Sequence, residues 1–427
     1  MIKASTLTTH IGNVSVTRIV PLAPEIVRFA ITAKIPDGAK HFTQPALRMY
    51  AALILTRTKK KSKRAIEEYI NQYGITLEVT PGIESITFTG SVRKEHVPAV
   101  SKLLLELIFD PVIESTEFVQ KKKLAKEANR EAHDDAKRAA HTAFVNTLYA
   151  HEPRLVIDTL KDELVHITAL TETSVQKIHT ALKSAVWFVS IVGDTHAEYG
   201  FLPFVKALSQ EAMPEVRVPI IATPVAARSH FTPIHSKTNI EVQMGNVGIV
   251  RSDDPTFIAF DFGIDVLGKV GGFSGRLMST VREKEGLTYG IYAHTHPHHR
   301  GDSFHFVIRT FFMAKDYEKG IASINRELTA IVEKGITEKE LNVFKEINKN
   351  EFILGHESNA TRLSLYHSLI VRGHSEAYLY EYQEQVQGLT RKMVNTALTK
   401  NIDLSNLVLS AAGPISKEGK PHITAHT

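Results

Sequence analysis

Residues 271–289 read Gly271-Gly272-Phe273-Ser274-Gly275-Arg276-Leu277 and, after three further residues, Val281-Arg282-Glu283-Lys284-Glu285-Gly286-Leu287-Thr288-Tyr289. The paired glycines predict a break in the chain, and the residues from Ser274 to Lys284 predict a helix that stops at Gly286. Alternating runs at 287–295 and 303–312 then predict a hairpin of two strands. This part of the chain therefore combines a glycine turn, a helix and an antiparallel strand pair.

The same order of elements occurs about 210 residues earlier in the chain. Before the hairpin, the two halves have strand-like runs at 13–20, 26–35, 229–235 and 239–250, and helical patterns at 44–55, 62–72, 254–269 and 274–284. The first half has its hairpin at 75–80 and 85–92, and helices follow the two hairpins at 97–109, 115–149, 316–334 and from 337 onward. Equivalent positions are Gln44 and Asp254, Ser62 and Ser274, Gly74 and Gly286, and Ser115 and Thr337, with offsets of 210, 212, 212 and 222 residues.

This repeat predicts an α+β protein of two homologous domains, 1–210 and 225–427, each with a mostly antiparallel sheet flanked by helices. A proline-rich segment between Pro203 and Pro224 is expected to join them.

Composition restricts the chemistry that this chain can perform. It has no Cys, which excludes disulfides, zinc–thiolate sites and cysteine nucleophiles. The net charge is only +5, and the basic run 57–64 contains no aromatic residue on which a base could stack, so we expect no nucleic-acid binding. The N-terminus lacks an apolar signal-peptide core and no run is long enough for a membrane span. We therefore expect a cytoplasmic protein, or a periplasmic one if a signal peptide was removed.

Four segments in a fixed order carry a resemblance to a known family. They are the stretch 271–289, the basic segment 54–62, the bend 148–153 and the strand-like run 189–194. Together they resemble the pitrilysin/insulinase family of zinc peptidases over nearly the whole chain. The resemblance implies two pitrilysin-like domains, in agreement with the repeat.

The zinc motif of that family is degenerate in this sequence. Members that cleave peptides carry H-x-x-E-H on a first-domain helix, where two His hold zinc and the Glu activates water. Aligning the basic segment places this motif at Arg48-Met49-Tyr50-Ala51-Ala52, without either His or the Glu. The distal ligand position falls at Glu127, and a carboxylate seven residues upstream is replaced by Gln120. One Glu cannot hold zinc, so we expect no metal in this chain and read Glu127 as a solvated or ion-paired residue.

The resemblance also implies a role for Arg282 and Tyr289. Their spacing matches an Arg/Tyr pair that, in the family, reaches from the second domain across a cavity to the zinc site of a first domain. Guanidinium and phenol groups are fixed hydrogen-bond donors for a carbonyl oxygen that gains negative charge. Gly271, Gly272 and Gly275 would form a flexible turn before Arg282. The alternative is a surface arginine and a core tyrosine.

Histidines are abundant and four of them follow Tyr289. Alternate strand residues share a face, so His294, His296 and His298 could bind an adventitious metal. Pro297 argues against a regular strand there, and we expect a solvated hairpin tip, with contact to a partner as the alternative. His133 and His141 are expected on the surface of the helix 115–149.

The resemblance covers two-subunit enzymes in which one chain carries the zinc motif and a homologous chain carries the Arg/Tyr pair. It implies that this chain is the zinc-free subunit of a heterodimeric metallopeptidase, inactive alone, that supplies Arg282 and Tyr289 in trans for hydrolysis of peptides. No cofactor is expected in this chain, and zinc would belong to the partner. The alternatives are a non-proteolytic structural homologue, like the core subunits of respiratory complexes, and a peptide-binding protein.

Overall fold

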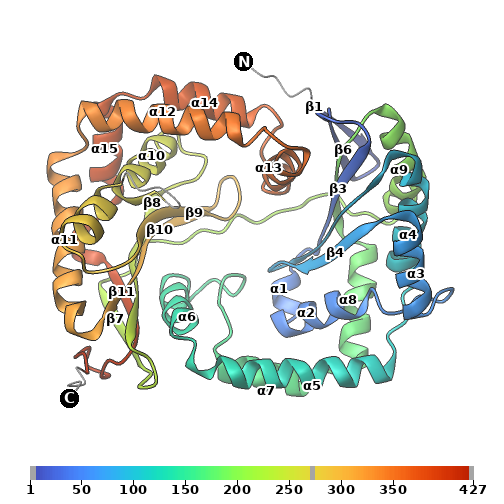
Figure 1. Cartoon of the computed structure of the whole chain (residues 1–427), viewed down its shortest axis with the longest axis horizontal. Coiled ribbons are helices and arrows are strands. Elements are labelled where there is room, and N and C mark those ends of the chain that lie inside the picture. The colour runs from blue at the N-terminus through green and yellow to red at the C-terminus, as the bar shows by residue number, and fades with distance from the viewer. Residues whose placement is uncertain (1–5, 270–274, 423–427) are drawn as a thin grey trace. The chain divides into compact units, whose positions relative to one another are not determined.

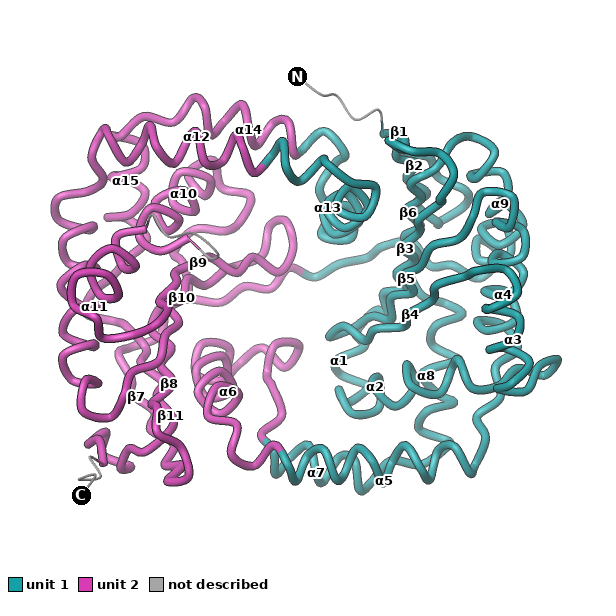
Figure 2. Tube along the Cα trace, viewed as in Figure 1, with its two compact units in different colours: residues 1–131, 160–218, 352–378 teal, residues 132–159, 219–351, 379–427 magenta. Residues whose placement is uncertain are grey.

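The computed structural model describes residues 6–269 and 275–422. The chain divides into two compact units, each built from three stretches (Figure 2). Unit 1 comprises residues 1–131, 160–218 and 352–378, and unit 2 comprises 132–159, 219–351 and 379–427. Each unit thus includes a segment from the other half of the chain. The predicted division into the continuous stretches 1–210 and 225–427 does not include this exchange of segments.

The sheet of unit 1 has six strands in the order β1-β2-β6-β3-β5-β4 (Figure 1). The strands are β1 Thr6–Ile11, β2 Val14–Ile19, β3 Ile26–Lys34, β4 Thr76–Pro81, β5 Ser85–Arg93 and β6 Val186–Val192. All pairs are antiparallel except β2 with β6. The expected mostly antiparallel sheet is therefore confirmed for this unit.

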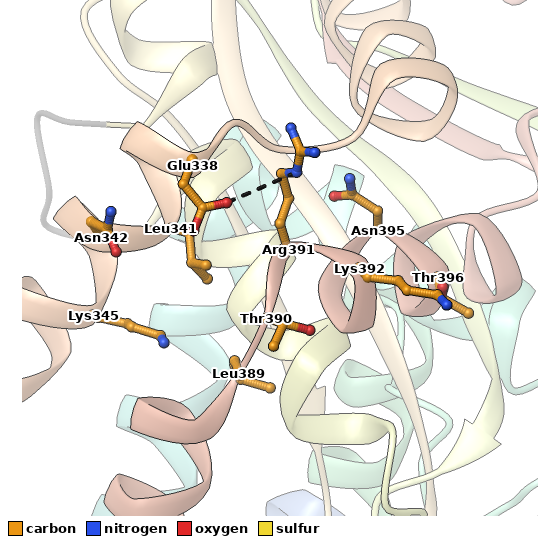
Figure 3. A pocket seen from close by; sticks show the side chains of 10 residues that line it. All are labelled: Glu338, Leu341, Asn342, Lys345, Leu389, Thr390, Arg391, Lys392, Asn395 and Thr396. Carbon is orange, nitrogen blue, oxygen red and sulfur yellow. Dashed lines mark ion pairs between the residues drawn. The ribbon is translucent and has the colours of Figure 1, made fainter.

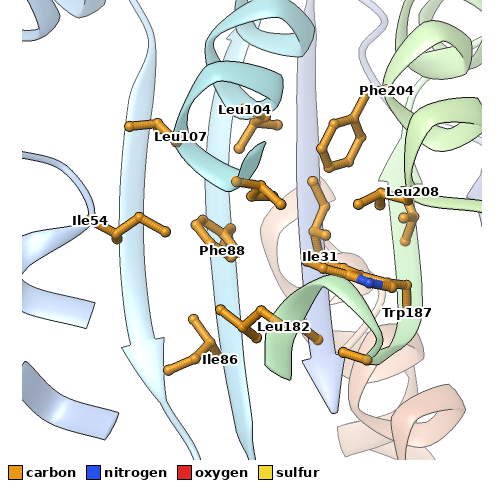
Figure 4. Packing of buried hydrophobic residues seen from close by; sticks show 14 of the residues in the cluster. Ile31, Ile54, Ile86, Phe88, Leu104, Leu107, Leu182, Trp187, Phe204 and Leu208 are labelled. Carbon is orange, nitrogen blue, oxygen red and sulfur yellow. The ribbon is translucent and has the colours of Figure 1, made fainter. Parts of the chain in front are cut away.

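Helices cover one face of this sheet and bury the main core of unit 1. The helices of unit 1 from the first half of the chain are α1 Gly38–His41, α2 Gln44–Leu53, α3 Lys63–Tyr73, α4 Val97–Phe109, α5 Ser115–Glu131, α7 Leu160–Ala169, α8 Glu172–Lys183 and α9 Thr195–Ser209. Of these, α2, α4 and α9 make the main contacts with the strands, and α5 and α7 pack on α2. Figure 4 shows Leu104 and Leu107 of α4 and Phe204 and Leu208 of α9 beside Phe88 and Trp187 of the sheet. Gly74 ends α3 with φ +58°, a conformation that glycine adopts at no steric cost.

The opposite face of the unit 1 sheet is covered by a helix from the second half of the chain, α13 Asn359–Val371. His367 of α13 is buried, and its two ring nitrogens lie 2.7 Å from Thr32 Oγ1 and 2.8 Å from Ser190 Oγ. Ile370 packs against Phe188 beside this contact. Polar and apolar contacts together place α13 on β3 and β6.

The sheet of unit 2 has five strands in the order β7-β11-β8-β10-β9. The strands are β7 Arg228–Pro233, β8 Asn239–Arg251, β9 Ile291–Pro297, β10 Ser303–Met313 and β11 Val408–Gly413. All pairs are antiparallel except β7 with β11. The two units thus share the same sheet architecture, in which one pair of strands is parallel and the others are antiparallel.

The helices of unit 2 are α6 Ala136–Leu148, α10 Phe257–Gly268, α11 Tyr317–Lys334, α12 Glu338–Leu354, α14 Tyr378–Gly388 and α15 Arg391–Asn401, with the last residues of α12 and the first of α14 assigned to unit 1. Helices α10, α11 and α15 bury the main core. The other face of the sheet is covered by α6, from the first half of the chain, which packs on β7, β8 and β11. Each sheet is therefore completed by a helix from the opposite half.

The single long helix predicted at 115–149 is wrong. The structure has α5, a short 3-10 turn at Ala132–Asp134, and α6. Asp135 caps α6, because its Oδ1 accepts a hydrogen bond of 2.9 Å from the backbone N–H of Arg138. The chain passes from unit 1 to unit 2 at this break. None of the helices in residues 6–269 and 275–422 combines the length and hydropathy of a membrane-spanning segment.

Candidate functional site

The segment aligned with the zinc motif lies on α2 and contains an ion pair. Arg48 is exposed on α2, and its guanidinium donates to the carboxylate of Glu163, which is buried on α7. Asn129 of α5 donates to the second carboxylate oxygen of Glu163 at 3.0 Å and to the carbonyl oxygen of Leu160 at 3.1 Å. Both oxygens of Glu163 are therefore engaged by protein donors.

These residues do not fit a zinc ion. Arginine stays protonated and cannot coordinate a metal, and Ala51 and Ala52 stand where the Glu and the second His would be. The side chain of Glu127 is 46% exposed, with Lys123 Nζ 3.9 Å from its carboxylate, so it is the ion-paired surface residue that we expected. Among the described residues, no three His, Cys, Asp or Glu side chains are grouped so that they could hold a metal ion.

Arg282 lies on a π-helix rather than on the predicted α-helix. The π-helix spans Met278–Lys284, and the backbone N–H of Glu285 donates to the carbonyl of Thr280 at 3.0 Å, five residues back. Such wide turns are rare in proteins, and many of those that do occur lie at functional sites. The Arg282 side chain is half-buried. Arg282 therefore lies on a helix, as predicted, but this helix is a π-helix.

Tyr289 is 85% exposed and lies two residues before β9, which begins at Ile291 instead of Leu287. The predicted core tyrosine, our alternative for this residue, is therefore not what the structure shows. Gly286 has φ +66° and ends the π-helix. On the other side, the hydroxyl of Thr310 donates to the carbonyl oxygen of Gly290 at 2.9 Å. The backbone is thus held on both sides of an exposed phenol.

Only part of the predicted glycine-rich turn lies within the described residues. Gly271 and Gly272 lie outside the described residues. At Gly275, an added Cβ would lie 2.8 Å from Cα of Gly268 at the end of α10, so a close approach of the two backbones requires glycine. Arg276, which we had not singled out, donates through two nitrogens to Glu340 at 2.6 and 2.7 Å and also to the carbonyl oxygen of Gly335. This arginine anchors the start of the Arg282 segment to α12.

The histidines after Tyr289 form the expected solvated hairpin tip only in part, since His296 is exposed whereas His294, His298 and His299 are half-buried. Strand β9 continues through Pro297, and His294 is half-buried on one face of the sheet. The ring of His296 lies 5.0 Å from that of His298 and 5.1 Å from that of His305 on β10. Burial, followed by the neighbouring imidazoles and Arg309, holds the pKa of His305 well below its ordinary value. Alternate residues of the predicted strands 287–295 and 303–312 face the same side of the sheet, and this pattern could have indicated that His305 lies near the other histidines.

His141 also differs from its expected surface position, since it packs at the face of the unit 2 sheet. Its Nδ1 lies 3.2 Å from Oε1 of Gln243 on β8. Burial lowers the pKa of His141 despite this hydrogen bond. His133 is exposed, as expected, and lies in the turn before α6.

Two hollows lie within single units. One, of about 640 Å³, lies between α12 and the start of α15, where Arg391 Nε is 3.9 Å from the carboxylate of Glu338 (Figure 3). The other, of about 520 Å³, lies between α13 and strands β4 and β5. The first is lined mainly by polar and charged side chains, and neither contains a residue that the sequence analysis had identified.

Comparison with protein families agrees with this architecture. Residues 49–159 match the model described as "Insulinase (Peptidase family M16)", and residues 206–348 match the model described as "Peptidase M16 inactive domain". The chain belongs to the insulinase, or M16, peptidase family.

Among curated proteins, a non-peptidase homolog of Helicobacter pylori, YmxG, is 22% identical over 148 residues, which span 35% of this chain and 34% of YmxG. The match therefore covers about a third of that protein. A protein of Mycobacterium tuberculosis described as an uncharacterized zinc protease is 19% identical over 331 residues, which span 77% of this chain and 73% of that protein.

Solved structures show the same fold at low identity. A peptidase M16 inactive domain from Pseudomonas fluorescens has a TM-score of 0.84 and 19% identity, over 97% of this chain and 99% of that chain. A protease from Helicobacter pylori has a TM-score of 0.80 and 17% identity, over 96% and 100%. The periplasmic protease PqqL from Escherichia coli has a TM-score of 0.71 and 13% identity, over 97% of this chain and 47% of that chain.

Proposed function

We propose that this chain is the zinc-free subunit of a heteromeric M16 peptidase and that it supplies Arg282 and Tyr289 to the zinc site of a homologous subunit. The observation that carries the proposal is the exposed phenol of Tyr289, held beside β9, in a chain whose own motif position has Arg48 paired with Glu163. A tyrosine that is 85% exposed adds little to its own core and is accessible to a substrate.

The chemistry proposed for this chain is binding and orientation. The guanidinium of Arg282 and the phenol of Tyr289 donate hydrogen bonds to the substrate carbonyl oxygen, and they act most strongly as that oxygen gains negative charge. The zinc and the attacking water would belong to the partner, since Arg48 and Ala52 leave no ligands here. This division of labour accounts for a second-domain pair that is present beside a first-domain motif that is absent.

The test is a co-expression experiment with a homologue that carries H-x-x-E-H. Arg282→Ala and Tyr289→Phe should each lower kcat/KM by roughly 100-fold, the loss typical of removing one transition-state donor. Tyr199→Phe, at another exposed tyrosine, is the matched control and should leave turnover unchanged. Unchanged turnover in both variants of the pair would refute the role in trans, as would stoichiometric zinc and peptidase activity in the chain alone.

A second candidate is a non-proteolytic role, favoured by the similarity to a non-peptidase homolog. In that case the chain would bind a partner or a peptide without hydrolysis. Such a protein should show no turnover with any H-x-x-E-H homologue, and Arg282→Ala should leave its complexes intact. The same co-expression experiment therefore separates the two candidates.

A further inference from the structure

One face of the unit 2 sheet gathers positively charged and imidazole side chains. In the register of β9 and β10, Arg309 is opposite Tyr292, Val307 is opposite His294 and His305 is opposite His296, so these residues share a face. On the other side of β10, Gln243 of β8 is opposite Arg309, and it also contacts His141 of α6. We call Arg309, His294, His305, His141 and Gln243 the Arg309 cluster.

Arg309 has no counter-ion in the part of the chain that the structure describes. Its side chain is half-buried, and its Nε is enclosed without a hydrogen-bond partner among the described residues. Glu241, the acidic residue next along this face of β8, interacts with Lys137 of α6. Half-burying a guanidinium without a partner costs free energy, so this arrangement is unfavourable for the fold taken alone.

The imidazoles around Arg309 leave further ring nitrogens unmatched. Nδ1 of His294 and Nε2 of His305 are both buried without a hydrogen-bond partner among residues 6–269 and 275–422. Burial, followed by the charge of Arg309, lowers the pKa of His294 to about 4, so His294 is neutral near pH 7. A neutral imidazole retains one N–H donor. The cluster therefore presents one fixed positive charge together with neutral polar groups.

We propose that the Arg309 cluster binds a carboxylate of a peptide, with Arg309 as the charged contact and His294 as its neighbour. A planar guanidinium matches a carboxylate geometrically and can bind it through two parallel hydrogen bonds. Strand β9 is the last strand of the described sheet, but its outer side packs against α10 and the π-helix, where the N–H of Ile291 donates to Sδ of Met278. A carboxylate would therefore reach Arg309 from the face of the sheet and not from its edge.

This inference is independent of the proposed function, because it concerns peptide binding by this chain without a partner subunit and without zinc. Failure of the experiment below would leave the role of Arg282 and Tyr289 untouched. Conversely, an inactive pair of Arg282 and Tyr289 would not remove a carboxylate site on β9 and β10.

The experiment uses the isolated full chain and fluorescence anisotropy with three short labelled peptides of one sequence. The first has a central Glu and an amidated C-terminus, the second has Gln and the amide, and the third has Gln and a free C-terminal carboxylate. At low salt, the first or the third peptide should bind about tenfold more tightly than the second, as expected for one charge-assisted contact. Which of the two binds more tightly identifies the source of the carboxylate. Equal affinity for all three peptides would overturn the proposal.

Variants assign the binding to the cluster. Arg309→Met should abolish the preference and leave the unfolding temperature equal or higher, because an unpaired half-buried charge is removed. His294→Phe, which keeps a planar ring, should weaken the preference. Arg300→Met, at an exposed arginine of the loop between β9 and β10, removes the same charge and should keep it. A preference that survives Arg309→Met, or one that is lost equally in Arg300→Met, contradicts the assignment.

Discussion

The arginines of this chain differ in what neutralises their charge, and the difference separates structural from functional roles. Arg48 is paired with a buried carboxylate at the position of a lost zinc ligand, so a fixed cation of the protein stands where a metal would otherwise be held. Arg276 is satisfied by two hydrogen bonds to Glu340. Arg309 has no carboxylate among the described residues. The first two therefore stabilise the fold, whereas the third is available to a ligand.

Replacement of Arg276 tests the structural role directly. Arg276→Met removes a two-point contact that is only 17% exposed and takes this donor from the carbonyl of Gly335, while Glu340 keeps the N–H and hydroxyl of Thr337 as donors. We expect the free energy of unfolding to fall by about 2 kcal/mol, and Arg276→Lys to recover little of it because an ammonium lacks the planar fork. Urea unfolding measures the change. The control is Arg326→Met, at a 53% exposed ion pair, which should cost less than about 1 kcal/mol. Equal costs at the two sites would contradict this reading.

The ends of the helices show which features a sequence pattern can reveal. Gly74 and Gly286 both have positive φ, and such glycines mark element ends in the sequence itself. The break at 132–135 contains neither Gly nor Pro, and it is made by the side chain of Asp135 capping α6. The local signal for this break was the pair Asp134-Asp135, because Asp is a favoured N-cap residue, but Asp also occurs within helices and so does not by itself place a break.

In the candidate site, too, local features could be predicted from the sequence and contacts between distant residues could not. The spacing of Arg282 and Tyr289 is local, and their segment is visible in the sequence. The pairing of Arg48 with Glu163 joins positions 115 residues apart, and the contact of His367 with Thr32 joins positions 335 residues apart. Patterns of neighbouring residues contain no information on such pairs, because they depend on how whole elements pack.

His367 should make the docking of α13 depend on pH. Burial holds its pKa at about 4, against an ordinary value of 6.5, so between these values the unfolded chain binds a proton that the folded chain does not. Stability is therefore lost as pH falls from about 6.5 to about 4, by up to about 3 kcal/mol for this group. In urea unfolding, His367→Gln should lose less stability than the wild type between about pH 7.5 and 4.5, by about 2 kcal/mol. Parallel losses in the two proteins would exclude His367 as the titrating group.

The exchange of α6 and α13 between the halves of the chain makes folding of each half dependent on the other. Without residues 352–378, the unit 1 sheet would lose its cover over Phe188 and leave the hydroxyls of Thr32 and Ser190 without their imidazole partner. Without residues 132–159, the unit 2 sheet would lose the helix that packs on β7, β8 and β11. Exposed apolar sheet faces favour aggregation. Neither half is therefore expected to be a stable protein alone.

Splitting the chain between Val218 and Pro219 tests this dependence, because Val218 is 70% exposed and the cut lies outside any helix or strand. Expressed alone, fragments 1–218 and 219–427 should aggregate or unfold without a cooperative transition. Expressed together, with a tag on one fragment only, they should co-purify, since each contains the helix that completes the other's sheet. His367→Asp in the second fragment introduces a charge at the buried contact and should weaken recovery, whereas Lys417→Asp at an exposed position should not. A monomeric 1–218 fragment that unfolds cooperatively would show that α13 is dispensable, and would contradict the dependence inferred from the exchanged helices.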